Sequence, residues 1–372
     1  MRLLITGADG FIGKNLISHL AERTDIDIVP FTREHAVDEL SVMLQDIDFV
    51  FHLAGVNRPE DPGEFKLGNT DLTAILCGAI ESTGRKIPVL YTSSIQAEAN
   101  NPYGVSKRAG EEILTGLSTQ QGSPLYIFRL PNVFGKWARP NYNSAVATFC
   151  NNISQGLPIQ INAPEAQISL VYIDDVIEAF LEVLDGSVTP QGYVDIQPLY
   201  QITVGALANQ IQAFRDSRDN LISEQVGTGL VRALYSTYVS YLKPEQFSYQ
   251  IPKFGDPRGV FVEMLKTKDA GQFSYFTAHP GITRGGHYHH SKTEKFLVIK
   301  GEACFRFRHI VTGEFYEKVT RGDTPEVVET VTGWSHDITN VGDSEMIVML
   351  WANEIFDRDK PDTYAKLVGT QA

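Results

Sequence analysis

The pattern of apolar residues changes near residue 245, and this change constrains the fold more than any other feature of the sequence. Before it, short apolar runs alternate with longer segments of helical spacing; the runs cover residues 2–6, 26–31, 48–55, 88–94 and 125–130. Such alternation is typical of a parallel sheet with helices on both faces. The spacing from Val204 to Leu242 predicts further helices. Residues 1–245 are therefore predicted to form an α/β domain with a Rossmann-type, doubly wound parallel sheet.

The second half of the chain has apolar residues in alternation with a period of two, separated by glycine-rich turns. The predicted strands cover residues 259–265, 272–278, 295–309, 315–320 and 346–353. Alternating strands between turns predict an antiparallel sandwich or barrel. Residues 246–372 are predicted to form this all-β domain, with the polar C-terminal tail as a loop or short helix. A chain of 372 residues has room for two such domains.

Charge and cysteine content limit the partners and the compartment. The formal net charge of −13 argues against a nucleic-acid or membrane partner, because both need a basic surface. The N-terminus lacks the apolar core of a signal peptide, and no apolar run approaches the roughly 18 residues of a membrane span. Three widely separated cysteines support neither a disulfide framework nor a thiolate zinc site. We expect a soluble, cytoplasmic protein.

A glycine-rich turn directly after the first predicted strand opens the first helix. Glycines at such a turn let backbone amides approach a pyrophosphate at the positive end of the helix. The alternative for a glycine pattern alone is a tight turn without a ligand. The cofactor-binding residues predicted from this turn are Gly7, Gly10, Phe11, Ile12 and Gly13.

Arg33 follows the second predicted strand, where an acidic residue usually binds the ribose 2′-hydroxyl of NAD. An arginine at this position favours a 2′-phosphate, so we predict NADP(H) as the cofactor. The alternative is a solvated surface arginine.

Tyr103 and Lys107 lie one helical turn apart and therefore share a face of their predicted helix. The lysine can lower the pKa of the tyrosine and bind the nicotinamide ribose, so that the phenol exchanges a proton with a carbonyl or hydroxyl. Ser94, at the end of the preceding strand, is expected to hydrogen bond to the same substrate oxygen; Ser93 is the alternative. The alternative is that Tyr103 and Lys107 are two surface side chains without a catalytic role.

These motifs, in this order, resemble the extended short-chain dehydrogenases/reductases that act on nucleotide sugars. The resemblance covers about residues 1–240 and includes His52-Leu53-Ala54-Gly55, Arg129-Leu130-Pro131-Asn132-Val133 and Tyr172-Ile173-Asp174-Asp175. It implies that Leu53, Ala54 and Gly55 line the cofactor. It also implies that Pro131, Asn132 and Val133 approach the nicotinamide, and that Arg129 faces the nucleotide sugar.

Histidines gather in the predicted β domain. His287 and His289 point to one face of a strand. Glu294, after the next turn, can complete a set of three metal ligands, and His336 can supply a fourth. Nitrogen and oxygen donors suit Zn, Fe, Mn or Ni. The alternative is a metal-free cluster in which an imidazole acts as a base.

The spacing of these residues resembles both motifs of the cupins, over about residues 250–355. The run from Phe254 to Glu263 and the segment Arg284-Gly285-Gly286-His287 also resemble the dTDP-4-dehydrorhamnose 3,5-epimerase branch of that family. That branch implies His287 as the base that removes a proton beside a sugar ketone, whereas the cupin motif implies it as a ligand; His290 is a further candidate. We expect a divalent metal, with Zn as the first choice.

The fusion of these two domains resembles bifunctional enzymes of capsule and O-antigen synthesis. The resemblance implies C3 epimerisation of a UDP-4-keto-6-deoxy-N-acetylhexosamine, then NADPH-dependent reduction at C4 to UDP-2-acetamido-2,6-dideoxy-L-talose. We expect a homodimer. Two alternatives stay open: a C4 epimerase or dehydratase that retains NAD and has a structural cupin, and a non-enzymatic NADP(H) sensor.

Overall fold

The computed structural model describes residues 1–190, 192–252, 254–256, 259–261, 265–267, 272–354 and 359–369. Contacts divide the chain into two compact units, one of residues 1–144 and 168–201 and the other of residues 145–167 and 202–372. The chain passes between the units more than once, so the predicted sequence boundary at residue 245 stays a prediction. Among the described residues, no helix combines the length and apolar character needed to cross a membrane.

The first unit is built on a parallel sheet of six strands in the order β2-β1-β3-β4-β5-β8. The strands are β1 (Arg2–Thr6), β2 (Asp27–Phe31), β3 (Phe49–His52), β4 (Val89–Ser94), β5 (Leu125–Leu130) and β8 (Gly192–Tyr193). Between β2 and β3 the chain forms only the short helical segments η1 (Val37–Glu39), α2 (Leu40–Met43) and η2 (Leu44–Asp46). The predicted Rossmann-type parallel sheet is confirmed.

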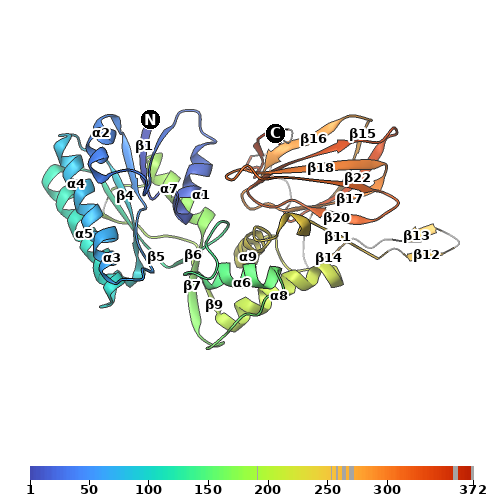
Figure 1. Ribbon diagram of the computed structural model, residues 1–372, viewed down its shortest axis with the longest axis horizontal. Helices are drawn as coiled ribbons and strands as arrows, with labels where there is room; N and C mark the ends of the chain where they lie inside the picture. Colours follow the sequence, from blue (N-terminus) through green and yellow to red (C-terminus); the bar gives the residue numbers. More distant parts are fainter. Residues whose placement is uncertain are drawn as a thin grey trace. The chain divides into compact units, whose positions relative to one another are not determined.

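Helices cover both faces of this sheet because its central strands, such as β3 and β4, are buried on both sides. Figure 1 shows α4 (Leu72–Ser82) and α5 (Pro102–Gln121) on one face, and α1 (Phe11–Leu20) and α7 (Ile173–Leu184) on the other. Fully buried aliphatic side chains fill the space between the sheet and the first of these layers; among them are Leu4, Val50, Leu76, Ile80 and Leu114. The segments α3 (Gly63–Phe65) and η3 (Lys66–Asp71) lead into α4, and β6 (Asn132–Phe134) pairs in parallel with β7 (Gln167–Tyr172).

The second unit contains two antiparallel sheets of five strands. One has the order β11-β20-β17-β22-β15 and the other β19-β18-β21-β16-β23. The strands of the first are β11 (Ser248–Gln250), β15 (Gln272–Ala278), β17 (Glu294–Lys300), β20 (Glu326–Glu329) and β22 (Met346–Ala352). Those of the second are β16 (Thr283–Tyr288), β18 (Glu302–His309), β19 (Phe315–Arg321), β21 (Trp334–Asn340) and β23 (Tyr364–Ala365).

Aromatic side chains join the two sheets face to face. The ring of Phe296 on β17 lies 5.7 Å from that of Phe305 on β18, and Phe247 packs edge-on against Phe307 at 5.4 Å. The predicted all-β C-terminal architecture is confirmed. Part of the predicted strand over 259–265 lies outside the described residues, which include β13 (Gly259–Phe261) paired with β12 (Phe254–Asp256).

Helices α6 (Ala145–Ser154), α8 (Val204–Asn220) and α9 (Gly229–Val239) belong to the same unit as the antiparallel sheets. The helices predicted between residues 204 and 242 are therefore present. A buried ion cluster ties them to the strands, because Glu329 on β20 binds both Arg218 of α8 and Lys295 of β17. The C-terminal tail differs from its prediction: between residues 359 and 369 it contains strand β23 and no helix, because its backbone pairs with β16.

Candidate active sites

The glycine-rich turn after β1 has no room for a side chain at Gly7 or at Gly13. Gly7 has φ +71°, and a Cβ atom there would lie 2.7 Å from the Ala54 nitrogen. A Cβ on Gly13 would lie 2.3 Å from the Gly7 oxygen. Gly10 caps α1 without a side-chain hydrogen bond, so the amides of the first helical turn, at Phe11 and Ile12, are left for a ligand. This turn fits the pyrophosphate of a dinucleotide.

The segment after β3 lies against this turn. The Leu53 nitrogen donates to the Thr6 oxygen at 3.2 Å, and the Ala54 nitrogen donates to Thr6 Oγ1 at 3.2 Å. His52 is buried between Thr6 and Thr73, and burial lowers the pKa of its imidazole to about 3. Thr6 thus holds the segment predicted to line the cofactor, and a neutral histidine holds the side chain of Thr6.

Ser94, Tyr103 and Lys107 converge where β4 ends and α5 begins. Asn101 caps α5 by accepting from the Gly104 nitrogen at 2.8 Å, which sets the first turn that carries Tyr103. Lys107 Nζ donates to the Thr92 oxygen at 2.9 Å. Burial lowers the pKa of this lysine to about 8. An ideal Cβ on Gly55 would lie 3.0 Å from Lys107 Nζ, so the lysine also lies beside the predicted cofactor segment.

The electrostatics of Tyr103 differ from the prediction. We predicted that Lys107 lowers the pKa of the phenol, yet burial raises it, and a hydrogen bond with Ser94 offsets only part of the shift. The reason is that the phenol is buried, which disfavours its charged form. A phenol with a raised pKa is protonated at neutral pH, which suits a proton donor. It is Ser94 that bonds to Tyr103, whereas Ser93 donates to Glu111 at 2.5 Å.

Glu111 is a buried carboxylate that the sequence analysis missed. Besides the bond from Ser93, it accepts from Arg129 Nη2 at 2.6 Å and from the Tyr193 hydroxyl at 2.9 Å. Arg129 also pairs with the exposed Glu98 at 3.0 Å. Its guanidinium is thus engaged by two carboxylates, and its expected role of facing a nucleotide sugar stays a prediction. The available signal was a glutamate four residues after Lys107, on the same face of α5.

The remaining predicted residues of the cofactor site lie at the ends of strands. Arg33 is exposed in the turn that follows β2, where the His35 nitrogen donates to the Thr32 oxygen. Pro131 and Val133 are half-buried at β6. Asn132 is exposed, and its side-chain amide donates to the Ser169 oxygen at 3.0 Å.

The four predicted metal ligands come together in the second unit. Each of the four offers one donor atom, and these atoms lie within 4.8 Å of one another. The residues are His287 on β16, His289, Glu294 at the start of β17 and His336 on β21. His289 Nε2 lies 3.2 Å from Glu294 Oε2, and His336 Nε2 lies 3.6 Å from the same oxygen. The register between β16 and β21 brings two of these residues together, because His287 is directly opposite His336.

The chemistry of this histidine cluster suits a divalent cation. Burial lowers the pKa of His287 to about 3, so its imidazole is neutral. Burial alone would raise the pKa of Glu294, but His289 and His336 hold it well below the usual value, so the carboxylate is ionised. His336 Nε2 is buried, and no described residue forms a hydrogen bond with it. Three imidazoles and one carboxylate are a donor set that Zn and other divalent metals accept.

Two further residues lie near the cluster. Lys292, which the sequence analysis missed, places Nζ 2.9 Å from Glu294 Oε1. The ring of His290 packs against Tyr364 at 4.8 Å and is not among the four clustered donors. Part of the epimerase-like run from Phe254 to Glu263 lies outside the described residues. Pro257 and Arg258 belong to that part.

The nucleotide-binding turn and the parallel sheet define a dinucleotide-dependent enzyme of the Rossmann type. Residues 3–194 match the NAD dependent epimerase/dehydratase family, and residues 254–364 match the polysaccharide biosynthesis C-terminal domain. The chain belongs to the NAD dependent epimerase/dehydratase family.

Relatives extend this similarity to the full chain. The UDP-2-acetamido-2,6-beta-L-arabino-hexul-4-ose reductase of Pseudomonas aeruginosa PA103 is 63% identical over 372 residues, which covers 100% of both chains. The capsular polysaccharide assembling protein CapF of Staphylococcus aureus has a crystal structure that matches with 41% identity and a TM-score of 0.69, covering 99% of this chain and 100% of that one. The predicted resemblance to enzymes of capsule and O-antigen synthesis is confirmed.

Other structural neighbours match part of the chain. The UDP-glucuronic acid 4-epimerase of Bacillus cereus, solved in complex with NAD, matches 58% of this chain and 84% of its own with a TM-score of 0.53. At 21% identity this likeness concerns the fold alone.

Proposed function

We propose that this chain is a bifunctional nucleotide-sugar enzyme of polysaccharide synthesis. Its β domain epimerises C3 of a UDP-4-keto-6-deoxy-N-acetylhexosamine, and its Rossmann domain then reduces C4 with NADPH to UDP-2-acetamido-2,6-dideoxy-L-talose. The observation that carries the proposal is the convergence of Ser94, Tyr103 and Lys107 beside a dinucleotide-binding turn. The full-length similarity to a UDP-sugar reductase supports it.

In the reduction, the residues of α5 and β4 hold and protonate the substrate oxygen. NADPH, when bound, supplies the hydride that C4 receives. Tyr103 donates its proton to the C4 oxygen, because burial keeps the phenol protonated. Ser94 hydrogen bonds to the same oxygen and orients it. Lys107, held by the Thr92 carbonyl, binds the nicotinamide ribose.

The histidine cluster is proposed as the site of C3 epimerisation. Its candidate ligands are His287, His289, Glu294 and His336, with Zn as the expected ion. When bound, a divalent ion polarises a ketone as a Lewis acid. A neutral imidazole takes the C3 proton; His287 is the candidate base if three residues suffice as ligands, and His290 is the further candidate. Epimerisation precedes reduction because only the 4-ketone makes the C3 proton acidic.

The test combines two signals in one reaction. The purified chain is mixed with the UDP-4-keto-6-deoxy-N-acetylhexosamine in deuterated water, and deuterium at C3 is followed together with nicotinamide absorbance. We expect deuterium to enter C3 without NADPH. Once NADPH is added, we expect it to be oxidised in a stoichiometric amount to the sugar. Oxidation without C3 exchange would remove the epimerase half of the proposal. Tightly held NAD with neither signal would support an enzyme that retains its cofactor.

Variants separate the two sites. Tyr103→Phe is expected to lower reduction by at least about 100-fold while C3 exchange persists, because the variant lacks the proton donor. Glu294→Ala is expected to abolish C3 exchange while NADPH binding persists. Tyr275→Phe and Glu314→Ala, at exposed positions of the β domain, are the matched controls. Equal loss of both activities in every variant, with folding intact, would contradict separate sites.

The cofactor and the oligomer are further parts of this proposal. Arg33→Ala is expected to raise the KM for NADPH and leave that for NADH nearly unchanged, since only NADPH carries the 2′-phosphate. A homodimer is expected in solution and is measurable by light scattering.

A further inference from the structure

The C-terminal segment of residues 359–369, the C-terminal strap, runs along the strand that carries His287. Within it, β23 pairs with β16 so that Ala365 is opposite His287 and Tyr364 is opposite Tyr288. The Lys366 nitrogen donates to the Gly286 oxygen at 2.8 Å. The strap is anchored beyond this point by Val368, which is 1% exposed. It is therefore an ordered part of the β domain.

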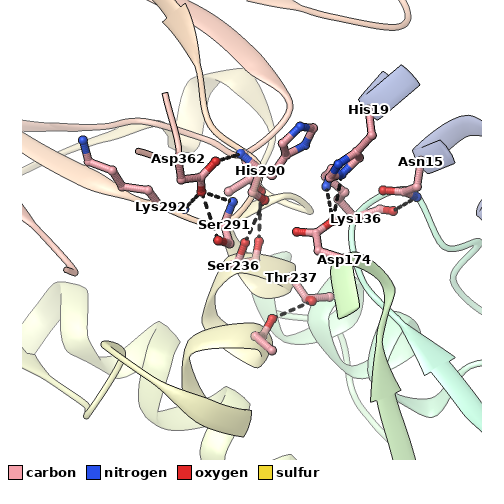
Figure 2. A network of polar contacts seen from close by, with 12 residues as sticks. Asn15, His19, Lys136, Asp174, Ser236, Thr237, His290, Ser291, Lys292 and Asp362 are labelled. Carbon is pink, nitrogen blue, oxygen red and sulfur yellow. Dashed lines mark hydrogen bonds and ion pairs between the residues drawn. The ribbon is translucent and has the colours of Figure 1, made fainter. Parts of the chain in front are cut away.

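The Asp362 carboxylate binds a row of three consecutive backbone amides in the loop that follows β16. Oδ1 accepts from the His290 nitrogen at 2.9 Å, and Oδ2 accepts from the nitrogens of Ser291 at 2.7 Å and Lys292 at 2.6 Å. Oδ2 also accepts from Ser291 Oγ at 3.0 Å. Figure 2 shows this carboxylate facing the loop, with Ser236 of α9 on the other side of His290. An ionised carboxylate forms such bonds about twice as strongly as a neutral group.

The backbone of Asp362 acts on the adjacent histidine. Its carbonyl oxygen is bound by His289 Nδ1. A carbonyl accepts only, so Nδ1 carries a proton, and Nε2 is the ring nitrogen that can bind a metal. That Nε2 lies 3.2 Å from Glu294 Oε2, inside the histidine cluster. The strap thus sets both the tautomer and the direction of one candidate ligand.

We infer that Asp362 is a positioning residue for the metal centre, acting through His289 and the loop of residues 290–292. This inference rests on the proposed metal centre of the β domain. Metal-binding histidines commonly donate their second ring N–H to a carbonyl or carboxylate, and the loss of that partner lowers metal affinity 10–100-fold. Here a single residue supplies the carbonyl and, with its carboxylate, fixes the loop that carries the histidine.

The test measures metal binding rather than turnover. The full-length chain is stripped with a chelator and titrated with Zn²⁺ against a competing chromophoric chelator, and with Co²⁺ by visible absorption. Asp362→Asn keeps the size of the side chain but presents an NH₂ group to amide donors. We expect its dissociation constant for both ions to rise by roughly 10–100-fold, with a weaker Co²⁺ band. Asp362→Glu, which keeps a carboxylate, is expected to lose less metal affinity than Asp362→Asn.

Asp359→Asn makes the same change at an exposed position of the strap and is expected to bind like the wild type. Hydrogen exchange at residues 290–292 is expected to accelerate in Asp362→Asn alone, which separates a loosened loop from an unfolded domain. Equal affinity of wild type and Asp362→Asn would overturn the inference, as would an equal loss in Asp359→Asn. A wild type that binds neither ion would instead refute the proposed metal centre.

Discussion

Removal of the negative charge of Glu111 provides a sharp test of how the reductase site is supported. Glu111 is 2% exposed and accepts from Ser93, from Arg129 through two nitrogens and from Tyr193. In Glu111→Gln one oxygen remains as an acceptor, while the new NH₂ group faces donors. Donors that bonded to the lost oxygen are then left without an acceptor in a buried site.

The magnitude follows from the burial of the partners. Breaking a fully buried ion pair by removing one member costs about 3–5 kcal/mol. The Arg129 side chain is 28% exposed and keeps its contact with Glu98, so we expect a smaller loss of about 2–3 kcal/mol in the free energy of unfolding. For a unit of this size, each kcal/mol lowers Tm by about 2–4 °C. Glu98→Gln removes an exposed partner and is expected to cost below about 1 kcal/mol.

Two assays read out the consequences. Urea unfolding at pH 7 gives the loss of stability. Hydrogen bonds and the charge of Arg129 hold the pKa of Glu111 below its usual 4.5 despite burial, so its contribution is present at pH 7 and is lost as the pH falls below about 4.5. Glu111 also raises the pKa of Lys107, so the alkaline limb of the reductase pH profile is expected to move to lower pH in Glu111→Gln.

An equal and small loss of stability in Glu111→Gln and Glu98→Gln would refute the reasoning about burial. An alkaline limb that stays in place in Glu111→Gln, with substrate saturating, would refute the electrostatic link to Lys107.

Four further predictions concern buried groups and close contacts. Gly13→Ala is expected to abolish NADPH binding, measured by fluorescence, because its Cβ would lie 2.3 Å from the Gly7 oxygen. The wild-type kcat/KM for NADPH is expected to fall above about pH 8, where Lys107 loses its charge, and a flat profile to pH 10 would contradict this. The same lysine opposes folding below pH 8, where its charge is buried, and this cost is expected to decline as pH rises from about 8 toward 10.5. Glu329→Gln leaves the buried Lys295 without its ion-pair partner, and calorimetry is expected to show a loss of about 3–5 kcal/mol.

Local periodicity was sufficient to predict the strands and the two architectures, because apolar spacing depends on neighbours in sequence. The positions of Ser94, Tyr103 and Lys107 could also be predicted, since one helix and one strand end carry them. The grouping of α8 and α9 with the antiparallel sheets could not, because it depends on a buried charge pair between Arg218 and Glu329, residues far apart in the chain.

The histidine cluster shows the same division between local and distant signals. The ligand types and their alternation on a strand predicted His287 and His289. Asp362 gave no signal, because aspartates are ordinary in a polar tail. Its role depends on β23 pairing with β16, a contact between segments more than 70 residues apart. The pKa of Tyr103 was missed for a similar reason, since burial is a property of the folded chain.

Burial places the two candidate sites in complementary protonation states at the same pH. It raises the pKa of the Tyr103 phenol, which therefore holds its proton, and lowers that of the His287 imidazole, which therefore lacks one. In both cases the cause is the cost of a charge away from water, which favours the neutral form of either group. A neutral phenol can give a proton to a reduced ketone oxygen, and a neutral imidazole can accept a proton or bind a metal. One chain can therefore supply an acid for reduction and a base or ligand for epimerisation near neutral pH.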